Sequence, residues 1–321
     1  FQKFLLKIMN KKISNSPRNL SSLNLKRLIN MGFGDEIMAT YYAKIEKQKY
    51  PDRQVVVGNY KTKQALDSRI FFNNPNISDP KKLDENKIVH FVDLNNTNRP
   101  YIDWQKSTVH KYYWKLNHRA IPGELYFDQQ EINEAQNAIR EAIAFWKSSN
   151  STEHKGIIFI ESSRIEEKSS KHEKKIFNKC GENQNWGFKR WEKTVEILKK
   201  NYLIINASHK NSFSHKNTFS YDCNFRIACA IMKYCNLYLG PEGGFSHAAA
   251  ALSKPGVVIY GGWIPPQVIG YDFHENLYVD IKGSPCGIRK ECDHCKKCMD
   301  LITVDNVINA VERNINKKIN Y

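Results

Sequence analysis

The first glycine-rich segment of this sequence is a candidate for ligand chemistry. Gly32 and Gly34 flank Phe33 and lead through Asp35 into a stretch with helical periodicity. Glycines let a backbone approach a ligand closely, and the start of a helix attracts anions. We therefore expect Gly32 and Gly34 to contact an anionic ligand. Asp35 has two interpretations: a residue that complements the helix dipole, or a general base that faces a cleft.

A second glycine-rich turn follows a short apolar strand in the C-terminal half. Glu242, Gly243 and Gly244 precede an alanine-rich stretch that contains His247. Glycines here would leave the first-turn amides of a helix available to a phosphate, and Glu242 would accept hydrogen bonds from sugar hydroxyls. The alternative interpretation is an ordinary capped turn between a strand and a helix.

Four cysteines lie close together near the C-terminus. They are Cys286, Cys292, Cys295 and Cys298, within 13 residues, and His294 lies among them. Thiolates at this density can hold one tetrahedral Zn²⁺, and the neighbouring lysines favour the thiolate form. Three interpretations stay open: a structural zinc site, free thiols or disulfides, and an iron–sulfur cluster. In none of them do we expect a catalytic role.

The elements that must position these residues follow an α/β pattern. Short apolar strands alternate with amphipathic helices, which predicts parallel βαβ units with ligands at the carboxyl ends of the strands. The predicted strands are 54–58, 88–94, 156–161, 202–207, 236–239 and 256–260. The predicted helices are 131–146, 190–200, 222–234 with Asp222 as N-cap, 244–252 and 304–315. The polar segment 148–155 predicts a boundary between domains 1–150 and 151–321.

Composition narrows the class of protein without naming a partner. An apolar content of 41% excludes global disorder, and no apolar run reaches the roughly 18 residues of a membrane span. No export signal is recognisable, so we expect a cytoplasmic protein with reduced thiols. The net charge of +16 suits nucleic acid, an anionic membrane surface or an anionic substrate, or reflects a lysine-rich composition alone.

The segment 236–262 resembles the donor-site signature of the ADP-heptose:lipopolysaccharide heptosyltransferases, glycosyltransferase family 9. The matching residues are Glu242-Gly243-Gly244, the run from His247 to Leu252, Pro255 and the strand 257–261. The family usually has Asp where this chain has Glu242. The pair Gly34-Asp35 resembles the family's first glycine loop, and residues 298–303 resemble its closing Cys-Met segment.

This resemblance implies a GT-B fold, in which two Rossmann-like domains face each other across a cleft. It places the acceptor in residues 1–150 and the nucleotide-sugar donor in residues 151–321. It implies Asp35 as the catalytic base of an inverting transfer that requires no metal or other cofactor. Two hydroxyl residues and a lysine would bind the donor phosphates. The candidates are Ser162 and Ser163, with Lys168 or Lys189 as the lysine.

The resulting hypothesis is transfer of a heptose or related sugar from a nucleoside-diphosphate sugar to a hydroxyl of a bacterial surface glycan or lipopolysaccharide-type acceptor. The first alternative is a GT-B enzyme with another donor, such as a GDP-sugar. The alternatives from other classes are a basic nucleic-acid-binding protein and a non-catalytic binding protein. No DNA- or RNA-binding motif is recognisable, so we expect no nucleic-acid partner. A basic face would allow peripheral contact with the anionic inner membrane.

Overall fold

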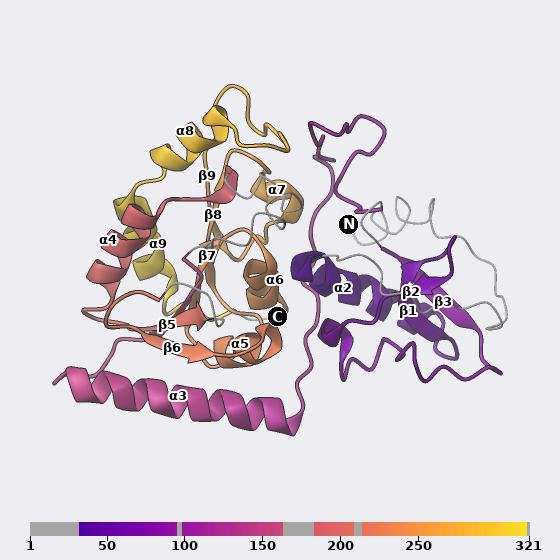
Figure 1. The fold of residues 1–321 in the computed structure, drawn as a ribbon, viewed down its shortest axis with the longest axis horizontal. Helices are drawn as coiled ribbons and strands as arrows, with labels where there is room; N and C mark the ends of the chain where they lie inside the picture. Colours follow the sequence, from indigo (N-terminus) through magenta and orange to yellow (C-terminus); the bar gives the residue numbers. More distant parts are fainter. Residues whose placement is uncertain (1–31, 95–97, 163–182, 209–213, 320–321) are drawn as a thin grey trace, which may run out of the picture. The chain divides into compact units, whose positions relative to one another are not determined.

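The computed structural model describes residues 32–94, 98–162, 183–208 and 214–319, and its helices and strands alternate along the chain (Figure 1). The strands are β1 (Gln54–Asn59), β2 (Gln64–Ala65), β3 (Val89–Asp93), β4 (Ile157–Ile160), β5 (Leu203–Ser208), β6 (Phe219–Asp222), β7 (Leu237–Pro241), β8 (Gly256–Gly261) and β9 (Glu275–Tyr278). The helices are α2 (Phe33–Lys49), η2 (Arg69–Phe71), α3 (Gln129–Ser149), α4 (Phe188–Leu198), α5 (Phe225–Met232), α6 (Gly244–Ala251), α7 (Pro266–Ile269), α8 (Asp293–Leu301) and α9 (Val304–Asn314). Within the described ranges, no helix combines the length and apolar character needed to cross a bilayer.

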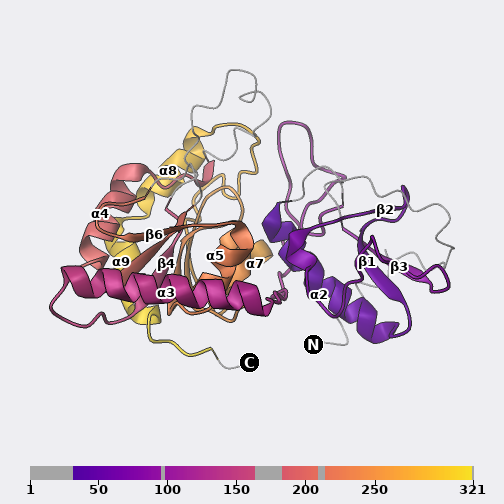
Figure 2. The ribbon, with the colours of Figure 1, turned by 60° about the horizontal axis from the view of Figure 1, so that its bottom comes forward.

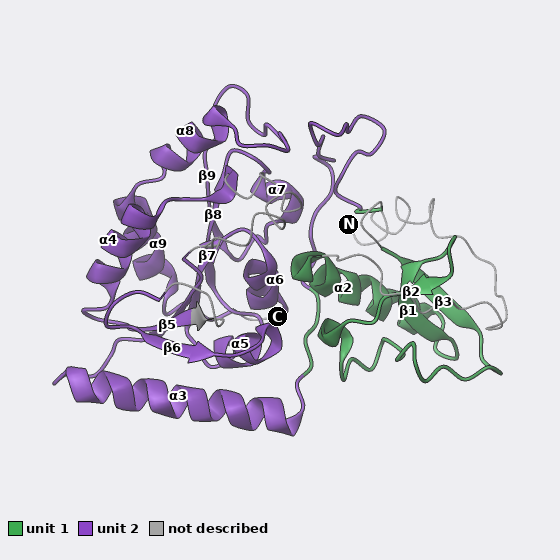
Figure 3. Cartoon of the chain, viewed as in Figure 1, with its two compact units in different colours: residues 1–99, 123–126 green, residues 100–122, 127–321 purple. Residues whose placement is uncertain are grey.

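The chain forms two compact units (Figure 3). The first contains the described residues of 1–99 and 123–126, and the second contains those of 100–122 and 127–321. The boundary predicted after residue 150 lies inside the second unit, because α3 packs against α5, β5 and β6 of that unit. The assignment of acceptor and donor to separate parts of the chain stays a prediction.

The first unit packs α2 against a small sheet with strand order β2-β1-β3. Strands β1 and β3 are parallel, with Gln54 opposite Val89, and β2 is antiparallel to β1. The central strand β1 contains three consecutive buried valines, Val55 to Val57, as expected for a strand covered on both faces. Its carboxyl end and that of β3 therefore lie at the same edge.

The second unit is built on a parallel sheet with strand order β6-β5-β4-β7-β8-β9. Helices α4 and α9 cover one face, and α3, α5 and α6 cover the other (Figure 1). The long helix α3 packs along α5, as Figure 2 shows. Every residue of β7 and β8 is buried, which explains why these strands are recognisable as apolar runs in the sequence.

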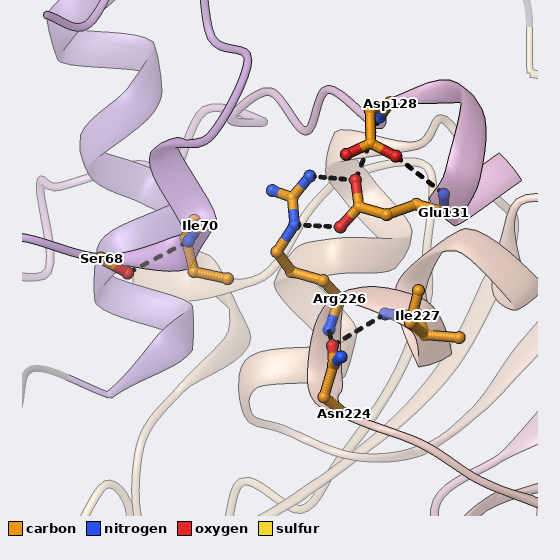
Figure 4. Close-up of polar contacts among 7 residues, drawn as sticks. All are labelled: Ser68, Ile70, Asp128, Glu131, Asn224, Arg226 and Ile227. Carbon is orange, nitrogen blue, oxygen red and sulfur yellow. Dashed lines mark hydrogen bonds and ion pairs between the residues drawn. The ribbon is translucent and has the colours of Figure 1, made fainter. Parts of the chain in front are cut away.

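One predicted helix start was wrong. Helix α5 begins at Phe225, and Asp222 is the last residue of β6 rather than the N-cap. The cap is Asn224, whose side-chain oxygen accepts hydrogen bonds from Arg226 N (2.9 Å) and Ile227 N (3.2 Å) (Figure 4). An amide oxygen accepts hydrogen bonds from the first-turn N–H groups as well as a carboxylate does. Asp222 and Asn224 were therefore both suitable N-caps by residue type.

Candidate active site and cysteine cluster

Asp35 lies in the first turn of α2 and forms an ion pair with Arg99. The distance between Arg99 Nε and Asp35 Oδ2 is 3.0 Å, and the two side chains are 24% and 10% exposed. The N-cap of α2 is Gly32, which has no side-chain cap, and Gly34 lies within the first helical turn. Asp35 therefore has both the helix dipole and a guanidinium near its carboxylate. Both members of the pair belong to the first unit.

Glu36, the next residue, has a contrasting environment. It is 5% exposed and accepts a hydrogen bond of 2.5 Å from Ser68 Oγ. Burial raises the pKa of Glu36 to about 7, and the charge of Asp35 acts in the same direction. Ser68 also accepts a hydrogen bond from Ile70 N at the start of η2, shown in Figure 4. Two adjacent carboxyl groups thus have different partners and different affinities for a proton.

In the second unit, the carboxyl ends of β4 and β7 bring predicted donor-site residues to one edge of the sheet. Ile160 pairs with Leu239, so the residues beyond each strand are neighbours. Ser162 follows β4 and is 7% exposed, and Gly243 follows β7 at the start of α6. The structure thus brings Ser162 to the same sheet edge as the first turn of α6. Ser163 and Lys168 lie outside the described residues.

The hydroxyl group of Tyr238 holds the turn after β7 through hydrogen bonds. Tyr238 Oη donates to Pro241 O (2.9 Å) and Glu161 Oε2 (3.2 Å). A Cβ at Gly240 would lie 2.4 Å from this hydroxyl, so no larger residue fits there without movement. Glycine at this position therefore permits a hydrogen bond that holds the turn, in addition to any approach of a ligand.

Glu242 has a polar partner from the segment that leads into α4. Gln184 Nε2 donates to Glu242 Oε2, so this segment lies beside the turn after β7. Lys189 is exposed in the first turn of α4. Trp186 and Trp191 are buried on either side of it, with ring centroids 4.9 Å apart. The two tryptophans anchor the start of α4 and leave Lys189 facing solvent.

His247 is part of the buried face of α6. It is 3% exposed, and its Nδ1 lies 2.7 Å from Tyr271 Oη. Burial lowers the pKa of His247 to about 3, so the imidazole is neutral near pH 7. A neutral, buried ring offers no charge to a phosphate. The geometry therefore gives His247 a packing partner, and its predicted donor contact stays a prediction with those of Gly243 and Gly244.

The four cysteines of the C-terminal segment come together around the start of α8. Cys286, Cys295 and Cys298 are buried, Cys292 is the N-cap of α8, and all four are free. The Sγ atoms of Cys286 and Cys295 are 2.9 Å apart, beyond the roughly 2.05 Å of a disulfide. Cys292 lowers the pKa of the Cys286 thiol and raises that of the Cys295 thiol. The segment therefore forms one thiol cluster rather than four separate side chains.

This cluster fits a thiophilic metal ion. Ligand atoms of Cys286, His294 and Cys295 lie within 4.8 Å of one another. A hydrogen bond from Cys295 lowers the pKa of the Cys286 thiol to about 6, which favours the thiolate that binds metal. A Cβ at Gly262 would lie 2.3 Å from the Cys298 Sγ, so the backbone closes tightly around the cluster. Sulfur and imidazole donors suit Zn²⁺ or iron rather than Mg²⁺ or Ca²⁺.

Sequence reasoning missed three polar residues of these sites. They are Arg99, Ser68 and Gln184, which contact Asp35, Glu36 and Glu242 respectively. Each contact joins residues far apart in the chain. Arg99 closely follows the predicted strand 88–94, and this position beyond a parallel strand's carboxyl end was the available signal for it, whereas no such signal marks Ser68 or Gln184.

Comparisons with known proteins bear on the fold. No protein-family model and no curated protein sequence matches the chain. Among solved structures, a family 9 glycosyltransferase from Veillonella parvula DSM 2008 has a TM-score of 0.56 at 13% identity, over 94% of this chain and 99% of that one. The iron-containing dodecameric glycosyltransferase TibC from enterotoxigenic E. coli H10407 has a TM-score of 0.55 at 14% identity, over 91% and 77%.

A second TibC structure, described as a heptosyltransferase in complex with ADP-D-β-D-heptose, gives a TM-score of 0.54 at 12% identity, over 92% of this chain and 77% of that one. At these identities the likeness concerns the course of the backbone. The predicted α/β class is therefore confirmed, and the resemblance to family 9 holds at the level of fold. The chain has the GT-B fold of the glycosyltransferase family 9 enzymes.

Proposed function

We propose that this chain is an inverting glycosyltransferase. It moves a heptose or related sugar from a nucleoside-diphosphate sugar to a hydroxyl of a bacterial surface glycan of the lipopolysaccharide type. The observation that carries the proposal is the ion pair of Asp35 with Arg99 in the first turn of α2, in a chain with this fold. The TibC complex with ADP-D-β-D-heptose supports a nucleoside-diphosphate heptose as donor.

Asp35 is the general base of the proposed reaction. Its carboxylate accepts the proton of the acceptor hydroxyl while the hydroxyl oxygen forms a bond to the anomeric carbon of the donor. The bond between that carbon and the diphosphate breaks on the opposite side, which inverts the configuration. A positioned base of this kind contributes roughly 10²–10⁴-fold in rate. Arg99 holds Oδ2 of the carboxylate and so fixes its direction.

The second unit binds the donor in this proposal. Ser162, Ser163, Lys189 or Lys168, and the first-turn amides at Gly243 and Gly244 hold the departing diphosphate, and Gly32 and Gly34 allow close approach in the first unit. Hydrogen-bond donors and a lysine at this position offset the negative charge that develops on the leaving group, and the transfer then needs no metal. Glu242 accepts hydrogen bonds from sugar hydroxyls in place of the one from Gln184.

A metal ion has a structural role in this account. Cys286, Cys292, Cys295 and Cys298 would hold Zn²⁺ as thiolates, and the bound ion would cross-link the segment before α8 to the helix itself. That TibC is iron-containing supports a metal here and leaves iron as the competing identity. No step of the transfer passes through this cluster.

A thermal-shift panel with ADP, GDP, UDP and CMP, alone and as their sugars, tests the proposal. A ligand at about 100 times its Kd adds about 2.7 kcal/mol to the free energy of unfolding, which is visible in Tm. We expect a selective shift with one nucleoside diphosphate, and a smaller shift in a Lys189→Gln variant. A chain that responds to none of these nucleotides would contradict the donor assignment. The exposed Lys82→Gln serves as the matched control.

A further inference from the structure

Residues 101–116 form a hairpin that belongs to the second unit, and we call this segment the aromatic hairpin. Ile102 and Trp114 form an antiparallel bridge. Asp103 N donates to Tyr113 O (2.8 Å), and Lys115 N donates to Tyr101 O (2.9 Å). Directly opposite residues of an antiparallel pair share a face, so Ile102, Trp114 and their alternate neighbours lie on one side.

That side of the aromatic hairpin is covered by the second unit. Trp114 Nε1 donates to Trp263 O (3.0 Å), and the two indole rings are 5.1 Å apart. Tyr112 N donates to Gly287 O (2.8 Å), and the backbones of Lys111 and Ile288 form an isolated antiparallel β-bridge. The hairpin is therefore attached through one face and its backbone.

Apolar side chains of the hairpin remain exposed at its tip and on both of its sides. Among the described residues, nine large apolar side chains are exposed, and four of them lie in this segment. The four are Trp104 (36%), Val109 (76%), Tyr113 (41%) and Leu116 (51%). Scattered single apolar side chains are normal on a surface, but a concentration of this kind marks a place of interaction.

The hairpin is also strongly basic. Its cations are Lys106, Lys111, Lys115 and, just beyond the hairpin, Arg119. The carboxylate of the segment, Asp103, lies 3.8 Å from Lys106, and Lys111 lies over the ring of Tyr113. Aromatic rings and aliphatic tips flanked by lysines are the composition that rests at the level of lipid headgroups.

We infer that the aromatic hairpin docks the protein on an anionic lipid bilayer. Tyr113 and Val109 at the tip enter the headgroup region, while Lys111 and Lys115, which alternate with Tyr113 on its side of the strand, contact lipid phosphates together with Lys106. A second copy of this chain would present the same excess of positive charge, in a molecule whose net charge is already +16, so the charge favours an anionic partner. The inference does not depend on the proposed transfer reaction.

Vesicle flotation with the full chain tests this inference. The vesicles contain phosphatidylcholine with phosphatidylglycerol, or phosphatidylcholine alone. We expect flotation with the anionic vesicles only. Each lysine near such a surface contributes roughly fivefold to partitioning, so Lys111→Gln with Lys115→Gln should weaken binding by roughly 25-fold. Lys82→Gln with Lys87→Gln removes the same charge from exposed positions elsewhere and should change binding by less than about twofold.

One further variant separates the contribution of apolar contact from that of charge and from folding. Tyr113→Ser should weaken flotation while the circular-dichroism melt stays unchanged, because this ring faces outward. Equal loss of binding in the hairpin pair and the control pair would show an effect of net charge and overturn the inference. Flotation of the hairpin variants equal to that of the natural chain would also overturn the inference. A hairpin-dependent change of mass in light scattering without lipid binding would assign the surface to a second copy instead.

Discussion

Arg99 Nε lies 3.0 Å from Asp35 Oδ2, so the loop that follows β3 is joined to the first turn of α2. The pair is formed within the first unit and does not depend on the second. If Asp35 accepts the proton of the acceptor, Arg99 is a positioning residue that acts through it. Its removal should then alter turnover more than substrate binding.

Arg99→Gln should lower kcat about 10- to 100-fold and change the KM for the donor by less than about threefold, because a small displacement of a catalytic group costs rate. Arg99→Lys should recover part of the loss. Lys44→Gln is the control, since Lys44 of α2 also pairs with a carboxylate of the same unit, that of Glu124. A KM effect without a kcat effect in Arg99→Gln would show that Arg99 binds substrate and does not position Asp35.

Glu36→Gln should change how stability depends on pH. The pKa of Glu36 is about 7 in the folded chain against an ordinary value of 4.5, so the folded state binds its proton more tightly than the unfolded state does. The contribution to stability is complete below about pH 4.5 and is lost as pH rises through about 7, a change of about 3 kcal/mol. Urea unfolding at pH values between about 5 and 8 should show this decline in the natural chain.

The amide that replaces the carboxyl group in Glu36→Gln cannot ionise, so the variant should show a flatter profile and exceed the natural chain in stability above about pH 7. The exposed Glu85 provides the control substitution, Glu85→Gln. Parallel profiles for the natural chain and the Glu36→Gln variant would contradict a proton held by Glu36.

Glu131→Ala should destabilise the second unit by about 3–5 kcal/mol. Arg226 makes two hydrogen bonds of 2.6 Å to the Glu131 carboxylate, as Figure 4 shows, and its side chain is 4% exposed. Removing Glu131 takes a two-point carboxylate partner from a buried guanidinium and also removes half of the capping box with Asp128. Glu196→Ala breaks an ion pair with Lys199 whose carboxylate is 54% exposed, and should cost less than about 1 kcal/mol in the same denaturant titration.

A metal chelator should lower Tm and expose the aromatic hairpin to trypsin. The segment that begins at Cys286 carries the hydrogen bond from Tyr112 to Gly287 and the bridge between Lys111 and Ile288, so loss of the metal loosens what holds the hairpin. Cys298→Ser should have the same effect. An unchanged Tm with unchanged tryptic cleavage would show that no metal supports this segment.

Gly287→Ala tests the same connection without altering a thiol. Gly287 has φ +63°, and a Cβ there would lie 2.0 Å from Tyr112 O. The variant should release the hairpin to trypsin while keeping its metal, measured by elemental analysis. If trypsin cleaved the hairpin of the variant no faster than that of the natural chain, the proposed attachment would be contradicted.

The sequence pattern predicted those parts of the fold whose signal is local. The valines of β1 and the residues 257–259 of β8 are short runs of β-branched apolar residues, which favour a covered strand. Strand β9 was missed because every residue of it is half-buried at the sheet edge and Asn276 interrupts the apolar pattern. The glycine turns are also local signals, and they indicated Asp35 and Glu242 as candidate site residues.

What the pattern could not supply are the partners of those residues. Arg99 and Gln184 reach Asp35 and Glu242 only after distant segments have folded together, and no spacing in the sequence encodes such a pair. The burial of His247 against Tyr271 is a tertiary effect of the same kind. The candidate chemistry was therefore predictable by residue type, and its electrostatic setting was not.

The most direct test of the account is single-turnover sugar transfer by Asp35→Asn, with the donor identified by thermal shift. Asparagine keeps the shape of the side chain but cannot accept the proton. We expect transfer to fall by at least roughly 10²-fold while the thermal shift produced by the donor stays the same. Transfer at the rate of the natural chain, with donor binding intact, would contradict Asp35 as the catalytic base.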